Sequence, residues 1–201
     1  MLIADFEKTF PKGPTIRVQL AEPASPPSVT AILDLCTGSA CLPIMLADAF
    51  PQAHIDAIDI SADALAVARR NVDDYQLQNR ISLIESDLYA GLSGQRYDLI
   101  TCNPPYVNAQ TMAALPAEFR AEPALALDGN TSSGTDGMDF IRQLLLTIPA
   151  HMSENAVLVL EIGNERDNFK RAFSSLEPLW FETSGGPDQV LLLTRQQLAR
   201  Q

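Results

Sequence analysis

Residues 97–106 read YDLITCNPPY, and this stretch decides the fold. The apolar side chains of Leu99, Ile100 and Cys102 indicate a buried strand, and the two prolines that follow cannot extend a sheet ladder. Proline also biases the residue before it toward an extended backbone. We therefore predict a stiff loop over residues 103–106 at the carboxyl end of a strand, the edge where open α/β sheets bind their ligands.

Outward from this stretch, short apolar runs alternate with helical patterns. Predicted strands cover residues 31–35, 55–60, 81–85, 97–102, 156–162, 178–182 and 189–194. Predicted helices cover 41–50, a segment capped by Ser61 with Leu65, Ala68, Val72 and Tyr75 on its apolar face, 112–119, a helix capped by Asp136, and 166–176. This alternation predicts an α/β fold with a seven-stranded, mostly parallel sheet covered by helices on both faces. The turn at residues 185–188 is too short for a crossover, so the last strand should be antiparallel.

Composition and length predict one main domain, over residues 31–201, preceded by an N-terminal helix remnant and a proline-rich connector over residues 1–30. No apolar run approaches the ~20 residues that span a bilayer, and the acidic and basic residues near the start exclude a signal peptide. Three cysteines in a chain of 201 residues favour a reducing compartment, which makes the cytoplasm the expected location.

The small-residue turn at residues 36–40 joins the first strand to the first helix and directs backbone amides at whatever binds there. Asp59 ends the second strand, where a carboxylate can accept hydrogen bonds from ribose hydroxyls. Asp87, after the third strand, is placed to meet an adenine amino group, and Leu88 can pack on the adenine face. The alternatives are a plain strand–helix connection for the turn and helix or loop caps for the two aspartates.

Four segments together resemble the S-adenosylmethionine-dependent methyltransferases, and more narrowly the protein glutamine N5-methyltransferase family. They are DLCTGSAC at 34–41, DIS at 59–61, SDL at 86–88 and NPPY at 103–106. The resemblance implies the class I, Rossmann-like methyltransferase fold, S-adenosyl-L-methionine as cofactor, and methylation of a glutamine side-chain amide. Cofactor-binding positions carried over by the motifs are Asp34, Cys36, Thr37, Gly38, Ser39, Ala40, Asp59, Ile60, Asp87, Leu88 and Asn103; catalytic positions are Asn103, Pro104, Pro105 and Tyr106.

Within that family, LCTGS at 35–39 and EFRAEP at 118–123 are most similar to the branch that modifies the third large-subunit ribosomal protein. The branch that modifies peptide-chain release factors usually has glycine where Cys36 stands. Two departures stand out. Ala40 replaces a family glycine, and its methyl group is expected to crowd the methionine part of the donor. The family's N-terminal helical domain and Pro-Arg segment do not precede the catalytic motifs, which favours either a fragment or an enzyme of reduced activity.

The resemblance implies a role for each group of the 103–106 loop. An amide nitrogen is a poor nucleophile because its lone pair is delocalised into the carbonyl. The side-chain oxygen of Asn103 and the carbonyl of Pro104 can accept its two hydrogens and orient the nitrogen. The ring of Tyr106 can stack on the amide and face a cationic sulfonium. No general base is expected.

The formal net charge is −11, from 14 basic and 25 acidic residues, which favours a basic protein partner over a nucleic acid. An adenine amino-group methyltransferase nevertheless remains an alternative, because the same loop suits that chemistry. A non-catalytic donor-binding module is a third. No metal site is expected, because the cysteines form no Cys-x-x-Cys pair and should be small buried side chains. Residues 122–123 and 129–137 are expected to cover the substrate, with a disordered insertion as the alternative, and Glu161 either shapes the donor pocket or is an ordinary strand-end acid.

Overall fold

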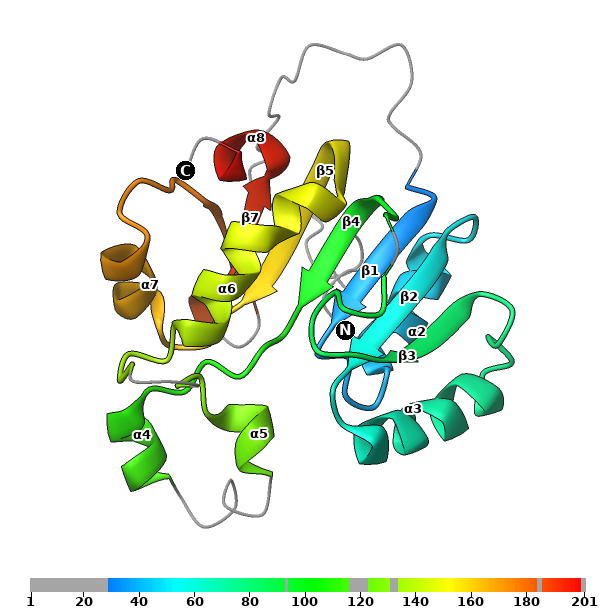
Figure 1. Ribbon diagram of the computed structural model, residues 1–201, viewed down its shortest axis with the longest axis horizontal. Helices are drawn as coiled ribbons and strands as arrows, with labels where there is room; N and C mark the ends of the chain where they lie inside the picture. Colours follow the sequence, from blue (N-terminus) through cyan, green and yellow to red (C-terminus); the bar gives the residue numbers. More distant parts are fainter. Residues whose placement is uncertain (1–28, 93, 116–122, 131–133, 184–185, 200–201) are drawn as a thin grey trace.

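The computed structural model describes residues 29–92, 94–115, 123–130, 134–183 and 186–199. One seven-stranded sheet runs through it in the order β3-β2-β1-β4-β5-β7-β6 (Figure 1). The strands are β1 (Ala31–Leu35), β2 (His54–Asp59), β3 (Ile81–Glu85), β4 (Tyr97–Cys102), β5 (Met152–Glu161), β6 (Leu179–Thr183) and β7 (Gly186–Thr194). Only β7 runs against its neighbours, β5 and β6, so the predicted mostly parallel sheet with an antiparallel last strand is confirmed.

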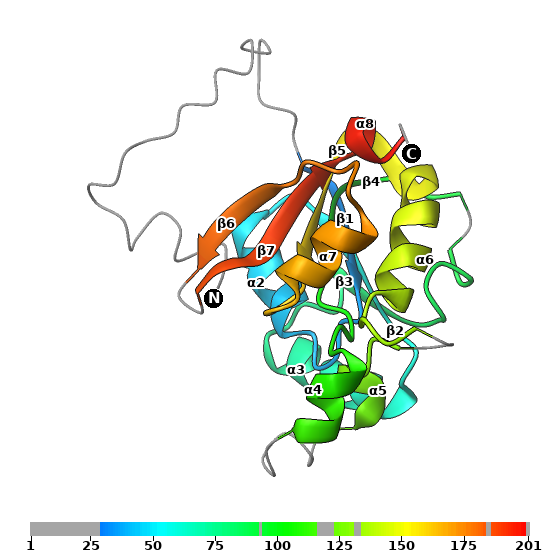
Figure 2. The ribbon, with the colours of Figure 1, turned by 90° about the vertical axis from the view of Figure 1, so that its left-hand side faces the viewer.

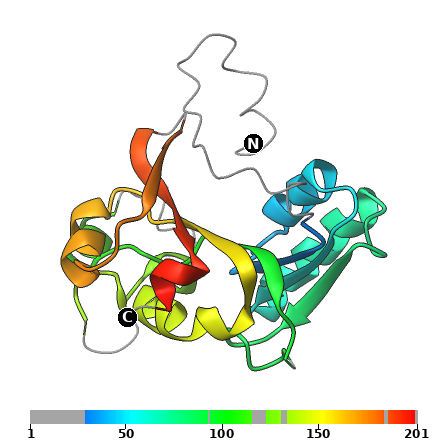
Figure 3. The same cartoon turned by 90° about the horizontal axis from the view of Figure 1, so that it is seen from above.

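Helices cover both faces of the sheet. One apolar cluster joins the β1–β2 side to α2 (Cys41–Ala49) and α3 (Ala62–Asp74). The other joins the centre of the sheet to α6 (Asp139–Thr147), α7 (Arg166–Ala172) and α8 (Arg195–Leu198). Seen from above, α2 and α6 lie on opposite sides of the sheet (Figure 3). This three-layer arrangement leaves the carboxyl ends of the parallel strands open.

Two short helices, α4 (Ala109–Ala114) and α5 (Ala124–Leu127), stand apart from the two layers. They lie together beyond the carboxyl end of β4 (Figures 1 and 2). Their segments are joined to each other by backbone hydrogen bonds, from Val107 N to the carbonyl of Leu127 and from Gly129 N to the carbonyl of Val107. The described part of the long connection after β4 thus lies at the carboxyl edge of the sheet, while residues 122 and 131–133 of the predicted substrate cover lie outside the described residues.

The predicted cap of α3 is present, because the Ser61 side chain accepts a hydrogen bond from Ala64 N. Leu65, Ala68 and Val72 are buried, as their spacing predicts. Tyr75 is 66% exposed, so its assignment to the apolar face was wrong. The helix has already ended there: Tyr75 is the C-cap, and the next residue, Gln76, has a left-handed backbone.

The observed bounds of several other elements also differ from the predicted ones. The helix predicted at 112–119 begins earlier, at Ala109, and residues 116–122 lie outside the described part. Met138, not Asp136, is the N-cap of α6, although the Asp136 carboxylate still accepts from Met138 N. The strand β5 starts at Met152 instead of 156 and contains an irregularity opposite β4. Helix α7 ends at Ala172 instead of 176.

The predicted N-terminal helix remnant and connector lie outside the described residues except for Val29 and Thr30. Within the described ranges, none of the helices combines the length and apolar character that crossing a bilayer requires.

Candidate active site

Sheet register brings three sequence segments to one edge. Leu35, the last residue of β1, pairs with Ile58 of β2 and with Cys102 of β4. The residues that follow these three are Cys36, Asp59 and Asn103. Because the strands are parallel, these residues leave the sheet side by side at its carboxyl end. The predicted donor and acceptor motifs therefore meet at one edge of the sheet.

The loop from Cys36 to Ala40 is a tight turn with a left-handed backbone at alternate positions. The φ angles of Cys36, Gly38 and Ala40 are 57°, 57° and 61°. Thr37 N donates to the carbonyl of Ile58 at 2.9 Å, and Ala40 N donates to the carbonyl of Thr37 at 3.0 Å. The two inward-directed amides are thus satisfied by β2 and by the turn itself.

Asp59 ties this loop to the next helix. One carboxylate oxygen accepts from Gly38 N at 2.8 Å, and the other accepts from Ser61 N at 2.9 Å. A carboxylate has about four lone-pair sites, so two of them remain for a ligand. Asp59 is only partly buried, and it can therefore hold the loop and bind a hydroxyl group at the same time.

Ala40 sits where a family glycine was expected. Its side chain is fully buried in the apolar cluster that contains Leu46 and Ala47. The methyl group therefore packs into the core rather than facing solvent. An alanine at this position costs about 1–2 kcal/mol, because a non-glycine residue must adopt a left-handed backbone. Burial of the methyl group offsets about 0.8 kcal/mol of that cost.

Asp34 lies inside the sheet and is 1% exposed. Burial raises the pKa of this carboxyl group from 3.8 to about 6, against the effect of a hydrogen bond from Thr101. That bond joins Thr101 Oγ1 to Asp34 Oδ1 at 2.6 Å, between residues that are in register on β1 and β4. Asp34 thus locks the two strands that carry the 36–40 and 103–106 loops, and it lies beneath the site's surface.

Three further residues that were predicted to bind the methyl donor lie at the same edge, after β2 and β3. Ile60 is 51% exposed, an apolar side chain open to solvent directly after Asp59. Asp87 is exposed, and Leu88 is half-buried with a left-handed φ of 48°. Asp59 pairs with Glu85 across the sheet, which places Asp87 two residues beyond the neighbouring strand end. Exposed apolar surface and carboxylates thus lie near one another at this edge.

In the 103–106 loop, Asn103 is exposed, Pro104 is buried, and Pro105 and Tyr106 are half-buried. Tyr106 lies against Gly163, which follows β5: a Cβ atom on Gly163 would come within 2.6 Å of Tyr106 Cε2. Gly137 makes a similar contact, since its Cβ would lie 2.2 Å from the carbonyl oxygen of Tyr106. Gly163 thus lets backbone approach the ring of Tyr106, and Gly137 lets backbone approach its carbonyl group.

Two residues that support the site were not predicted from the sequence. Asn71 of α3 donates to the carbonyl of Ser39 at 2.8 Å and so anchors the 36–40 loop. Glu165 is buried and accepts from Asn108 Nδ2 at 2.6 Å, which ties the segment after Tyr106 to α7. Thr101 is a polar residue near the end of β4, and its place beside Asp34 could have been predicted from the two strand bounds. Asn71 and Glu165 lie in ordinary helical surroundings, and nothing in the pattern marked them.

The cysteines are not equally buried. Cys102 is buried, and burial raises the pKa of its thiol well above 9.0. Cys36 is half-buried, while Cys41 is exposed, contrary to prediction. Its position in the first turn of α2 faces outward because Pro43, Leu46 and Ala47 occupy the buried side. Glu161 is half-buried, and burial raises the pKa of its carboxyl group.

Comparison with known proteins agrees with this geometry. Residues 19–130 match the family model described as "Methyltransferase small domain". The chain is 54% identical over 173 residues to the "Ribosomal protein uL3 glutamine methyltransferase" of Bordetella pertussis, covering 86% of the chain and 57% of that protein. Identity to the protein of the same name from Burkholderia pseudomallei is 50% over 180 residues, with the same two coverages. The chain therefore spans little more than half the length of these relatives.

Among solved structures, a ribosomal protein L11 methylase from Lactobacillus delbrueckii subsp. bulgaricus superposes with a TM-score of 0.51 at 18% identity, covering 88% of this chain and 71% of that one. This similarity supports the fold, which is the class I methyltransferase fold predicted from the sequence. The strand order, the loop after β1, the acidic end of β2 and the family match agree, and the chain belongs to the methyltransferase small domain family.

Proposed function

We propose that this chain is the catalytic domain of a protein glutamine N5-methyltransferase that uses S-adenosyl-L-methionine and modifies the large-subunit ribosomal protein uL3. The observation that carries the proposal is the position of Asn103. Its side chain is exposed at the end of β4, next in register to the 36–40 loop, and backed by the buried Pro104. The names of the relatives at 50–54% identity support the choice of substrate.

The residues present fit the proposed cofactor. Asp59 retains free lone pairs for ribose hydroxyls, and Ile60 offers an exposed apolar surface for adenine beside Asp87 and Leu88. Gly38, which has a φ of 57° and no side chain, allows close approach of a ligand's methionine part. When bound, S-adenosylmethionine supplies a methyl group on a positively charged sulfur.

The chain's own residues prepare the acceptor. The Asn103 side-chain oxygen and the Pro104 carbonyl accept the two hydrogens of the glutamine amide, so that the nitrogen presents one face to the donor. These acceptors favour the positive charge that develops on nitrogen before it loses one proton. The ring of Tyr106 covers the amide plane, and Pro105 stiffens the loop between them.

Charge favours a protein substrate over a nucleic acid. The chain has 25 acidic and 14 basic residues, a balance that attracts a basic ribosomal protein and repels a phosphate backbone. A ribosomal protein substrate also implies action in the cytoplasm. DNA or RNA adenine and release-factor glutamine remain the alternative acceptors, since the 103–106 loop alone does not discriminate among them.

The decisive experiment is methyl transfer from radiolabelled S-adenosylmethionine to unmethylated uL3, with Asn103→Ala as the test variant. Removing one positioned acceptor typically costs about 2.7–4 kcal/mol in the barrier, so we expect a rate about 10²–10³-fold lower. Because Asn103 is exposed, thermal unfolding should change little.

Asn79→Ala, an exposed asparagine in the turn after α3, serves as the matched control and should retain the wild-type rate. An Asn103→Ala protein with wild-type turnover would contradict the catalytic role. Label on a release factor or a DNA oligomer but not on uL3 would move the assignment to that acceptor. Absence of donor binding by calorimetry would favour a non-catalytic module.

A further inference from the structure

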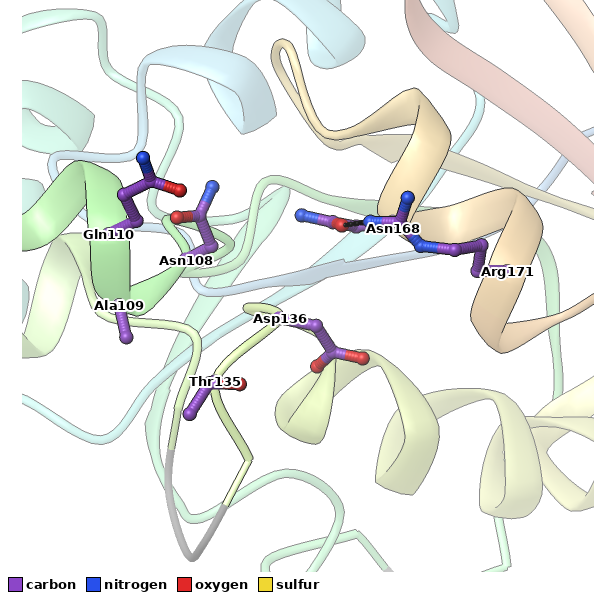
Figure 4. A pocket seen from close by; sticks show the side chains of 7 residues that line it. All are labelled: Asn108, Ala109, Gln110, Thr135, Asp136, Asn168 and Arg171. Carbon is purple, nitrogen blue, oxygen red and sulfur yellow. Dashed lines mark hydrogen bonds between the residues drawn. The ribbon is translucent and has the colours of Figure 1, made fainter.

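A polar cavity lies beside the proposed acceptor loop, between α4 and α7. Its volume is about 470 Å³. The side chains of Asn108 and Gln110 border it on one side, those of Asn168 and Arg171 on the other, and Thr135 and Asp136 lie below (Figure 4). Ala109 completes the lining. The size falls within the roughly 300–1,000 Å³ of ligand sites in proteins.

The walls of this cavity are held together by a buried carboxylate. Glu165 accepts from Asn108 Nδ2 through one oxygen and from Asn168 Nδ2 through the other. Asn108 also caps α4, because its side-chain oxygen accepts from Thr111 N at 2.9 Å. Glu165 thereby links the start of α4 to α7, the two helices that border the cavity.

The lining suits a polypeptide main chain. The side chains of Gln110 and Thr135 have no hydrogen-bond partner among the described residues, and each can both donate and accept. Asp136 adds a carboxylate held by Arg142, and Arg171 adds a cation. Ala109 is the one apolar residue of the lining, whereas pockets for small molecules are mostly apolar. With a single arginine and a net charge of −11, the surroundings also disfavour a phosphate backbone.

The cavity lies within reach of the target residue. Asn108 is five positions after Asn103, so their Cα atoms are at most about 18 Å apart. A substrate segment of about five extended residues spans that distance. Tyr106, between the two, is fixed against Gly163, which precedes Glu165 by two residues. A glutamine held at Asn103 therefore has its chain neighbours within reach of this lining.

We infer that the cavity between α4 and α7 is a subsite for the substrate main chain within about five residues of the target glutamine. This inference rests on the proposed function and deepens it. Gln110 and Thr135 bind peptide N–H and C=O groups of the flanking segment. The hydrogen bonds of Glu165 with Asn108 and Asn168 keep the subsite close to Tyr106.

Filling the cavity tests the inference. Ala109→Trp places a large side chain in the lining, and Ala114→Trp places the same side chain at another exposed position of α4 that does not line the cavity. With unmethylated uL3 as substrate, we expect Ala109→Trp to raise KM at least about tenfold, with kcat at saturation and the affinity for S-adenosylmethionine nearly unchanged. Ala114→Trp should match the wild type in all three.

A second comparison separates substrate length from folding. The wild type should use a peptide with six residues on each side of the glutamine better than one with a single flanking residue, and Gln110→Ala should reduce this preference without changing thermal unfolding. Equal KM values for the two tryptophan variants, or an unchanged length preference in Gln110→Ala, would overturn the subsite. Failure of the wild type to methylate uL3 at all would instead refute the proposed function, and the subsite with it.

Discussion

At the scale of single residues, the site depends on positions where backbone and side chain compete for space. Gly163 has a φ of +51°, and its lack of a side chain admits the ring of Tyr106. The sequence placed Tyr106 in the acceptor loop but gave no indication that Gly163, more than fifty residues later, would support it. Contacts of this kind follow from tertiary packing, which periodicity and spacing do not encode.

Gly163→Ala should therefore displace Tyr106. The new Cβ would lie 2.6 Å from Cε2, a distance that the ring must relieve by moving. We expect methyl transfer to fall at least about tenfold. The control is Gly94→Ala, which has a similar φ of +68° and no atom within 4 Å of the new Cβ. Both variants should lose about 1 kcal/mol from backbone strain, but transfer by Gly94→Ala should stay at the wild-type rate. Equal rates in the two variants would show that Tyr106 tolerates the shift.

At the scale of elements, the strands were predicted better than the helix ends. The bounds of β1, β3 and β4 were exact. β1 and β4 are short and almost entirely buried, and β3 is largely apolar until Glu85. Helix α7 was predicted too long because Phe173 and Leu176 continue the apolar spacing after the helix ends; both pack against the core from the irregular segment. Helix α5 was not predicted, since four residues carry no readable periodicity.

The end of α3 has a feature that the spacing of apolar residues does not predict. Gln76 N donates to the carbonyl of Asp73, and Leu77 N to that of Val72, the two hydrogen bonds of a Schellman motif. Glycine is the usual residue at the position that Gln76 holds with a φ of 57°. Gln76→Gly should therefore stabilise the protein by about 0.5–1 kcal/mol, measured by urea unfolding, because Gln76 is exposed and loses no buried surface.

Gln78→Gly, two residues later and without a left-handed φ, is the comparison and should bring no gain. It also removes the hydrogen bond from Gln78 to Asp73, so a small loss is expected. A loss of stability in Gln76→Gly would mean that the glutamine side chain contributes more than its backbone strain costs.

At the scale of the whole molecule, two buried or bound carboxylates make opposite contributions to the pH dependence of folding. Burial raises the pKa of Asp34 to about 6, so the folded state retains a proton that the unfolded chain loses near pH 4. This group lowers stability as pH rises from about 4 to about 6, by up to about 3 kcal/mol. The difference in unfolding free energy between Asp34→Asn and the wild type should therefore shift in favour of the variant over that range and stay constant above it.

Asp98 contributes to the pH dependence of stability with the opposite sign. Partial burial raises its pKa, but hydrogen bonds from Thr30, Ser153 and Ala31 outweigh burial and leave the pKa below 3.8. Its contribution to stability is present above about pH 4 and is lost as pH falls through the lowered pKa. Asp98→Asn should be less stable than the wild type at neutral pH, with the difference shrinking in acid. Parallel pH profiles for the two variants, measured by thermal unfolding, would contradict both assignments.

The architecture as a whole was predictable, since alternating buried strands and helices leave few topologies. The gathering of Cys36, Asp59 and Asn103 at one edge followed from the same argument. The supporting hydrogen bonds of Asn71 and Glu165 could not be predicted in this way. A polar side chain that bonds to a distant carbonyl or amide cannot be distinguished, in the sequence, from one that is solvated.

Asp59 accepts hydrogen bonds from Gly38 N and Ser61 N through its two oxygens, so one side chain joins the turn after β1 to the start of α3. Under the proposed function, a nucleoside bound at this edge would meet a turn that the chain's own hydrogen bonds already hold, and binding would order few further residues there. The affinity for that portion of the cofactor would then depend mainly on how well the two surfaces fit.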